Sequence, residues 1–190
     1  MFKYIKFIEI LICTQALIIS TMIPVFITIP VNYKDIQIID LPISWQIPLI
    51  ILFSLIYKRD IVLKAFTIYL FIGLFFLPIF HQGGSLGYIL TPNFGYLIGI
   101  YPLIIILSNL NNKNIPINLF TFIKTAILAI ITMHLVGIIY TFIQIIYIKN
   151  LDIIIYNISK LSLGKIGFHI LMLTPITLII KQINSLRNQK

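Results

Sequence analysis

Six long apolar segments, separated by shorter stretches that hold most of the charge, constrain this chain more than any other feature of its sequence. They cover residues 9–31, 43–57, 61–81, 94–110, 119–148 and 163–180. About 20 apolar residues suffice to cross the hydrocarbon part of a bilayer as a helix. Only 10% of the residues are charged, against about 25% in a typical soluble domain. The sequence therefore predicts an all-α, polytopic membrane protein with six transmembrane helices, in one domain that covers residues 1–190.

Lysine and arginine residues lie unevenly on the two sides of the predicted helices. One side holds Lys3, Lys6, Lys58, Arg59, Lys113, Lys181, Arg187 and Lys190, and the other holds Lys34, Lys149, Lys160 and Lys165. Basic residues accumulate on the cytoplasmic side of membrane proteins. This bias predicts that both termini are cytoplasmic, or stromal in a plastid. The frequent use of Ile, Phe, Asn and Lys is typical of A/T-rich coding, so we expect a bacterial plasma membrane or a plastid membrane.

The same orientation places three polar segments, 32–42, 83–93 and 149–165, together on the outer side. The central one opens the stretch 83–99, which holds five of the nine glycines and no charge. Irregular backbone at membrane depth is tolerated only where it is buried in protein or lines a water-filled cavity. We therefore expect residues 83–91 to cover a cavity, and residues 92–99 to start a helix that Asn93 caps.

Several side chains around this stretch have two interpretations each. Tyr88 and Trp45 fit either the aromatic belt at the membrane interface or a cavity wall. Tyr96, one turn into a helix beside glycines, favours the cavity. Gln46 is a buried amide that must bond a neighbouring helix or a ligand. Gly95 starts a Gly-x-x-x-Gly spacing that serves close helix packing or a ligand.

Two titratable residues lie inside the fifth apolar segment, where charge is costly and a functional role is the default hypothesis. For His134 the sequence favours the structural alternative, a neutral, hydrogen-bonded role in the helices. Lys124 lies near the inner end, from which its side chain can extend to the interface.

Enzyme and nucleic-acid signatures are missing from the sequence. The five acidic residues are scattered and form no metal-binding group; they are Glu9, Asp35, Asp40, Asp60 and Asp152. No phosphate-binding loop occurs, and the basic residues form no single stripe that would bind nucleic acid. We therefore predict no catalytic residue, no metal and no cofactor, and any active transport would need an energy-supplying partner.

One part of the chain, residues 41–100, carries a family pattern in order and spacing. It consists of Leu41-Pro42-Ile43-Ser44-Trp45-Gln46, the basic turn Lys58-Arg59, Leu77-Pro78-Ile79-Phe80, Gly83-Gly84 and the run from Leu90 to Gly99. This pattern resembles the BioY family, the biotin-binding S components of energy-coupling factor (ECF) transporters.

The resemblance implies a six-helix protein that captures biotin near its outer face and works with a membrane coupling subunit and two ATPases. It implies a small-residue face, Ala16-x-x-x-Ser20, for the coupling subunit. The substrate-binding residues expected from the pattern and the outer loops are Gln46, Tyr88, Asn93, Gly95, Tyr96, Lys165 and His169.

The chain departs from the family pattern near its last helix. There His169 and Met172 stand where the family has an acid and a lysine, so contacts to the carboxylate and ureido groups are expected from Lys165 and Asn93. Two alternatives remain open at this point: an S component for another vitamin, and a non-transporting scaffold subunit of a membrane complex.

Overall fold

The computed structural model describes residues 2–30, 36–80, 83–111 and 117–188. Its α-helices are α1 (Phe2–Met22), α2 (Gln46–Ile56), α3 (Arg59–Phe75), α4 (Pro92–Ile98), α5 (Ile100–Ser108), α6 (Leu119–Ile143), α7 (Ile145–Ile148), α8 (Leu151–Ile158), α9 (Gly164–Leu171) and α10 (Leu173–Asn188). A 3₁₀ turn, η1 (Leu86–Leu90), precedes α4, and a π-helical turn, η2 (Ser159–Leu163), joins α8 to α9. Two antiparallel strands, β1 (Pro24–Pro30) and β2 (Ile36–Ser44), form a hairpin. The loop residues Lys34, Asp35, Lys113 and Lys190, used above for orientation, lie outside the described residues.

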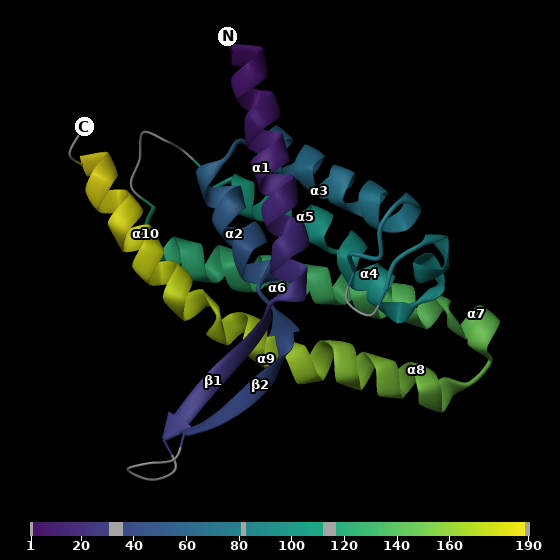
Figure 1. Ribbon diagram of the computed structural model, residues 1–190. Helices are drawn as coiled ribbons and strands as arrows, with labels where there is room; N and C mark the ends of the chain where they lie inside the picture. The colour runs from purple at the N-terminus through teal and green to yellow at the C-terminus, as the bar shows by residue number, and fades with distance from the viewer. Residues whose placement is uncertain (1, 31–35, 81–82, 112–116, 189–190) are drawn as a thin grey trace.

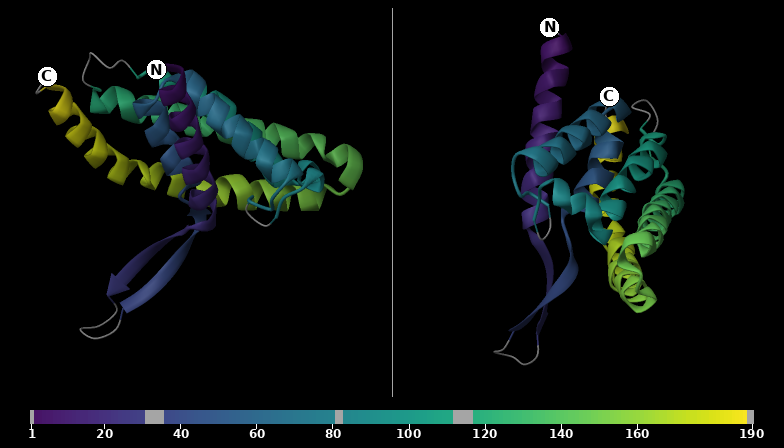
Figure 2. Two further views of the ribbon diagram at one scale, coloured as in Figure 1. Left: turned by 45° about the horizontal axis from the view of Figure 1, so that its top comes forward. Right: turned by 90° about the vertical axis from the view of Figure 1, so that its right-hand side faces the viewer.

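The helices form one bundle, in which α4 and α5 pack against α6 and α1 packs against α3. The elements α8, η2, α9 and α10 follow one another along a curved path beside α6 (Figure 1). The hairpin projects from one end of the bundle, away from the start of α1 and the end of α10 (Figures 1 and 2). The all-helical class predicted from the apolar segments is confirmed, apart from this hairpin.

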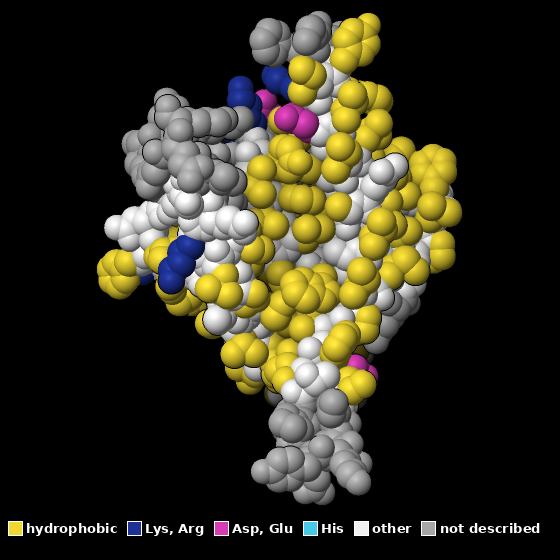
Figure 3. Space-filling model, turned by 60° about the vertical axis from the view of Figure 1, so that its left-hand side comes forward, with side chains coloured by type: hydrophobic (Ala, Val, Ile, Leu, Met, Phe, Trp, Pro, Cys, Tyr) yellow, Lys and Arg dark blue, Asp and Glu magenta, His cyan; other side chains and the backbone are white. Residues whose placement is uncertain are grey.

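Large apolar side chains cover much of the outer surface, as Figure 3 shows for one face. Exposed examples on α1 include Tyr4, Phe7 and Ile8. A contiguous apolar surface of this kind is typical of a protein in lipid. Three helical stretches are long and apolar enough to cross a membrane, namely Tyr4–Met22, Leu119–Ile148 and Leu151–Gln182, and Gln46–Ile56 and Pro92–Ser108 are shorter apolar helices. The protein is thus a helical membrane protein, while the count of six spans stays a prediction.

The prediction that the first helix extends to residue 31 was wrong. Helix α1 ends at Met22, and the next residues pair as β1 with β2. Pro24 and Pro30 lack the backbone N–H that a helix interior needs, and the β-branched residues between them favour an extended strand. The hairpin brings Leu41, Ile43 and Ser44 back to the bundle at the end of α1.

The later segments have different limits from those predicted. Helix α3 ends at Phe75 rather than near residue 81, because the chain turns before Pro78. The last apolar segment is part of a longer helical run that begins at Leu151 and continues to Asn188. This earlier start adds about three turns of helix, which contact α6.

Candidate functional site

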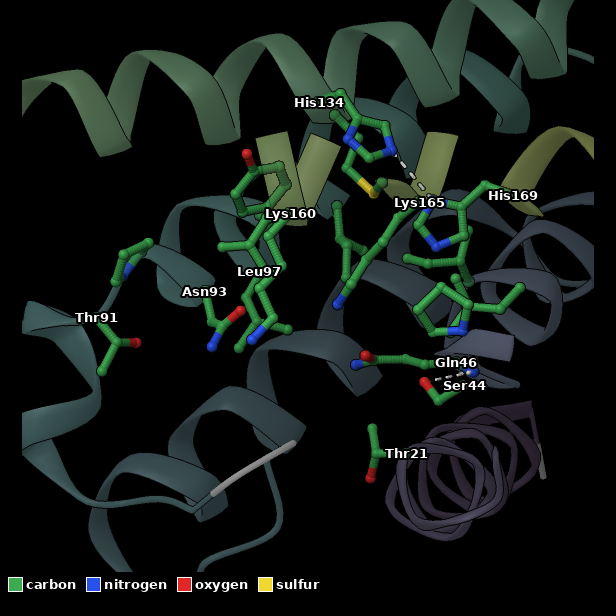
Figure 4. A pocket seen from close by; sticks show the side chains of 18 of the residues that line it. Thr21, Ser44, Gln46, Thr91, Asn93, Leu97, His134, Lys160, Lys165 and His169 are labelled. Atoms are coloured by element: carbon green, nitrogen blue, oxygen red, sulfur yellow. Dashed lines mark hydrogen bonds between the residues drawn. The ribbon is translucent and has the colours of Figure 1, made fainter. Parts of the chain in front are cut away.

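A cavity of about 710 Å³ opens between the hairpin, the outer loops and the helices. Its wall is built from the end of α1, the inner ends of β1 and β2, α2, η1, α4, α6, and the α8–α9 run. Segments far apart in the sequence therefore contribute to one space. Polar side chains of several of these elements, among them Gln46, Asn93 and Lys165, point into it (Figure 4).

Six of the seven predicted site residues line this cavity. They are Gln46, Tyr88, Asn93, Tyr96, Lys165 and His169. Their role toward a ligand stays a prediction, but the structure brings them together from four different elements, α2, η1, α4 and α9. Trp45, for which the sequence left two interpretations, is 40% exposed and does not line the cavity.

Gly95 is the seventh, and it does not line the cavity. A Cβ atom placed on it would lie 2.3 Å from the Cβ of Tyr140 on α6. Gly99 and Gly137 are equally tight, since a Cβ on Gly99 would lie 2.5 Å from the Met133 carbonyl oxygen and one on Gly137 would lie 2.4 Å from the Tyr96 ring. The three glycines let α4 and α6 approach closely, which is the packing interpretation of the glycine spacing.

Asn93 is not the residue that caps α4. The cap position belongs to Thr91, and Pro92 follows at the first helical position, where its missing N–H costs nothing. The Thr91 hydroxyl donates to the Tyr88 carbonyl (2.7 Å) and fixes the turn. Asn93 is therefore one residue inside the helix, and its amide points into the cavity (Figure 4).

Tyr88, in η1, is buried with 6% of its surface exposed and packs against Phe80, with ring centroids 4.7 Å apart. It thus belongs to the cavity wall rather than to the outer aromatic belt. Burial raises the pKa of Tyr88 to about 12, so its phenol stays neutral at physiological pH.

Four side chains along one wall are joined by hydrogen bonds. The Tyr96 hydroxyl lies 2.8 Å from Ser162 Oγ, which lies 3.2 Å from His134 Nδ1. His134 Nε2 in turn lies 3.1 Å from His169 Nδ1. His134 and His169 are 2% and 7% exposed. Sequence reasoning left His134 between two interpretations and missed Ser162, because nothing in the local sequence shows which helix faces which.

Two other polar atoms at the cavity have no hydrogen-bond partner in the part of the chain that the structure describes. Gln46 Nε2 and Tyr69 Oη are buried without a hydrogen bond to any described residue, although Tyr69 lies close to Thr21 and Gln46. The amide of Asn93 and the ammonium groups of Lys160 and Lys165 point into the same space (Figure 4). A buried polar atom left unpaired is costly, so Gln46 Nε2 and Tyr69 Oη indicate a place for a polar ligand or water.

The electrostatic character of the cavity is positive. Lys160 and Lys165 line it, and no aspartate or glutamate is among the residues that line it. Lys160 lies within the π-helical turn η2, and Lys165 follows in α9. Five residues in an α-helix turn through about 140°, and the wider π turn brings them back toward one face. Among the described residues, no group of three or more His, Cys, Asp or Glu side chains could hold a metal ion.

Comparisons with known proteins agree with this arrangement. A family model described as the BioY family matches residues 3–183. A curated relative, "Probable biotin transporter BioY" from Lysinibacillus sphaericus, is 59% identical over 32 residues, which is 17% of this chain and 16% of that protein's length.

A solved structure shares the fold over nearly the whole chain. It is the S component for biotin from an ECF-type ABC transporter, with a TM-score of 0.63 and 19% identity, and the match covers 99% of this chain and 93% of the other. The family match spans most of the sequence, and it shows that the chain belongs to the BioY family.

Proposed function

We propose that this chain is the S component of an ECF transporter and captures biotin for uptake across a membrane. The single observation that carries the proposal is the cavity of about 710 Å³, which six of the seven predicted binding residues line and in which Gln46 Nε2 and Tyr69 Oη have no hydrogen-bond partner among the described residues. The volume lies in the range of small-molecule sites, about 300–1,000 Å³. Membership of the BioY family and the fold of a biotin S component support biotin as the ligand.

The positive end of the cavity suits the carboxylate of biotin. Lys160 and Lys165 approach it from the α8–α9 run, and the lining residues include no acid that would compete for them. A hydrogen bond to a charged partner contributes about 1.5–3 kcal/mol. The two lysines therefore supply a binding group that distinguishes the free acid from its esters and amides.

The remaining polar groups suit the ureido ring of biotin, which carries one carbonyl and two N–H groups. Gln46 Nε2 is a buried donor without a partner and can donate to the ureido carbonyl. Asn93 offers both a donor and an acceptor from the start of α4. Tyr96, Leu97 and Tyr88 provide apolar surface for the fused rings.

The protein acts by binding, without catalysis, in this proposal. A coupling membrane subunit and two ATPases supply the energy for release, since the chain lacks a phosphate-binding loop. The small-residue pair expected to meet the coupling subunit is not an open face, because Ser20 is 5% exposed and its hydroxyl donates to the Leu17 carbonyl (2.8 Å). The multi-pass topology, with cytoplasmic or stromal termini in a bacterial plasma or plastid membrane, belongs to the same proposal.

Direct binding of labelled biotin to the purified protein in detergent tests the proposal. We expect saturation at micromolar concentration or below, with competition by unlabelled biotin and not by biotin methyl ester. Saturation only at millimolar concentration, with tighter binding of another vitamin, would replace biotin by that vitamin. An absence of saturable binding for every vitamin tested would favour a scaffold subunit instead.

A further inference from the structure

The hydrogen-bonded wall of the cavity joins four side chains from four elements: Tyr96 of α4, Ser162 of η2, His134 of α6 and His169 of α9. This series of hydrogen bonds ends at His169, whose Nε2 atom bonds to no described residue. His169 lines the cavity, and Figure 4 shows its ring beside Lys165. What His169 offers to a ligand therefore depends on which of its two nitrogens carries the proton.

Hydrogen-bond rules leave two arrangements for the two neutral imidazole rings of this hydrogen-bonded series. A bond between two imidazoles needs one nitrogen that donates and one that accepts, so the two rings cannot both be fully protonated. In the first arrangement, His169 Nδ1–H donates to His134, His134 Nδ1–H donates to Ser162, and Ser162 donates to Tyr96. In the second, every donor and acceptor is reversed, and His169 carries its proton on Nε2.

Two observations favour the first arrangement. Its last donor, the Tyr96 hydroxyl, has an acceptor in Thr141, whose own hydroxyl donates to the Gly137 carbonyl (2.8 Å) and keeps its lone pairs free. The Lys165 side chain lies beside His169 (Figure 4), and a cation near the cavity side of this ring interacts favourably with a lone pair and unfavourably with an N–H.

We propose that Tyr96, Ser162 and His134 are positioning residues that hold His169 as its Nδ1–H tautomer and present the Nε2 lone pair to an N–H group of the ligand. This inference rests on the proposed function and sharpens it. It explains how a cavity without any carboxylate accepts a ureido N–H: a neutral imidazole, oriented from behind, takes the place of the acid.

Nitrogen NMR of protein labelled with ¹⁵N in the histidine rings tests the tautomer without any ligand. We expect a protonated Nδ1 and an unprotonated Nε2 for His169. The signals are assigned by single substitution of the three histidines. Ser162→Ala removes the acceptor of His134 and is expected to give a mixture of both tautomers. Ser162→Thr, which keeps the hydroxyl, is expected to restore the wild-type spectrum.

Ligand affinity gives the second readout. In Ser162→Ala we expect biotin affinity to fall about three- to tenfold, as for one neutral hydrogen bond. Biotin methylated on its ureido nitrogens is expected to bind the wild type more weakly than biotin does, and this discrimination is expected to shrink in Ser162→Ala. Ser159→Ala, an exposed serine of the same π turn that does not line the cavity, is the matched control.

If Ser162→Ala fails to fold, Tyr96→Phe interrupts the series of hydrogen bonds at another point. It frees the Ser162 hydroxyl to donate to His134, and this is expected to reverse the direction of the hydrogen bonds. A protonated His169 Nε2 in the wild type would overturn the proposal, as would a Ser162→Ala protein that matches Ser159→Ala in both readouts. If the wild type binds no biotin, the proposed function fails, but the ligand-free spectrum still decides the tautomer.

Discussion

The α4–α6 contact is closely packed, whereas the cavity beside it leaves polar atoms without a hydrogen-bond partner among the described residues. At the contact, Gly95, Gly99 and Gly137 leave no room even for a methyl group, because rings and backbone already fill the space. At the cavity, Gln46 Nε2 is buried with no partner among the described residues, and Lys165 points into open space. The α4–α6 contact has no space for a ligand, whereas the cavity has unpaired polar groups that a ligand can bind.

This difference distinguishes the packed α4–α6 contact, which supports the site, from the site itself. A closely packed contact transmits even a small displacement, since protein interiors have few voids to absorb it. Tyr96 and His134 lie on opposite sides of that contact and belong to the cavity wall. The packed contact therefore sets the position of the unpaired groups, and substitutions in the two regions are expected to affect stability and affinity differently.

The largest effect is expected from breaking the packed contact with Gly99→Ala. The new Cβ would lie 2.5 Å from the Met133 carbonyl oxygen, and backbone cannot move aside as a flexible side chain can. Overpacking of this kind costs about 1–3 kcal/mol. Thermal unfolding in detergent should show the loss, and biotin affinity should fall with it because α4 shifts against α6.

Gly167→Ala is the matched control for this substitution. No atom lies within 4 Å of a Cβ at Gly167, in the middle of α9, and alanine is favoured over glycine in a helix by about 1 kcal/mol. We expect equal or higher stability. Equal destabilisation by both substitutions would show that the α4–α6 contact is no tighter than the rest of the bundle.

A substitution on the unpaired side, Lys165→Met, is expected to lower biotin affinity about ten- to a hundredfold, the range for a hydrogen bond to a charged group. The free energy of unfolding is expected to stay unchanged, since Lys165 makes no ion pair with any described residue. Titration of biotin and of its methyl ester measures the effect, and only the free acid should be affected. Lys124→Met removes a cation that lies over the Phe120 ring, outside the cavity, and should leave affinity unchanged.

The smallest effects on stability and affinity are expected from Gln46→Met. The direction of the stability change is the sharpest test of whether the cavity and the packed contact differ. The substitution removes a buried amide nitrogen that lacks a partner, so the free energy of unfolding should stay equal or rise by up to about 1 kcal/mol. Biotin affinity should fall about three- to tenfold. The neighbouring Trp45→Phe, outside the cavity, should change neither quantity; a loss of stability in Gln46→Met would mean that the amide serves the fold.

The sequence predicted the helical membrane class and six of the residues that line the cavity, because both leave local patterns. Apolar length identifies the helices, and the stretch around Asn93 and Tyr96 combines glycine with polar residues where a lipid-facing helix would have neither. The hairpin was missed because Ile, Val and Phe are apolar in a strand and in a membrane helix alike. Pro24 and Pro30, at the two ends of β1, were the signal that could have separated the two.

The hydrogen-bonded wall could not be predicted in the same way. Ser162 and His134 are 28 residues apart and meet only because α6 and the α8–α9 run lie side by side. The role of Gly95 was ambiguous for a related reason, since Gly-x-x-x-Gly spacing shows that something approaches closely and not what it is. Contacts between helices depend on the rotation of each helix, which a single sequence does not determine.

The π-helical turn η2 also has a consequence for how such a binding site can change over evolutionary time. Inserting one residue into an α-helix rotates everything after it by about 100°, which would pull α10 off its contacts. A π turn absorbs an extra residue locally. Gain or loss of a residue between Lys160 and Lys165 can therefore alter the cavity wall while the last helix keeps its packing, so ligand preference and fold can diverge independently at this point.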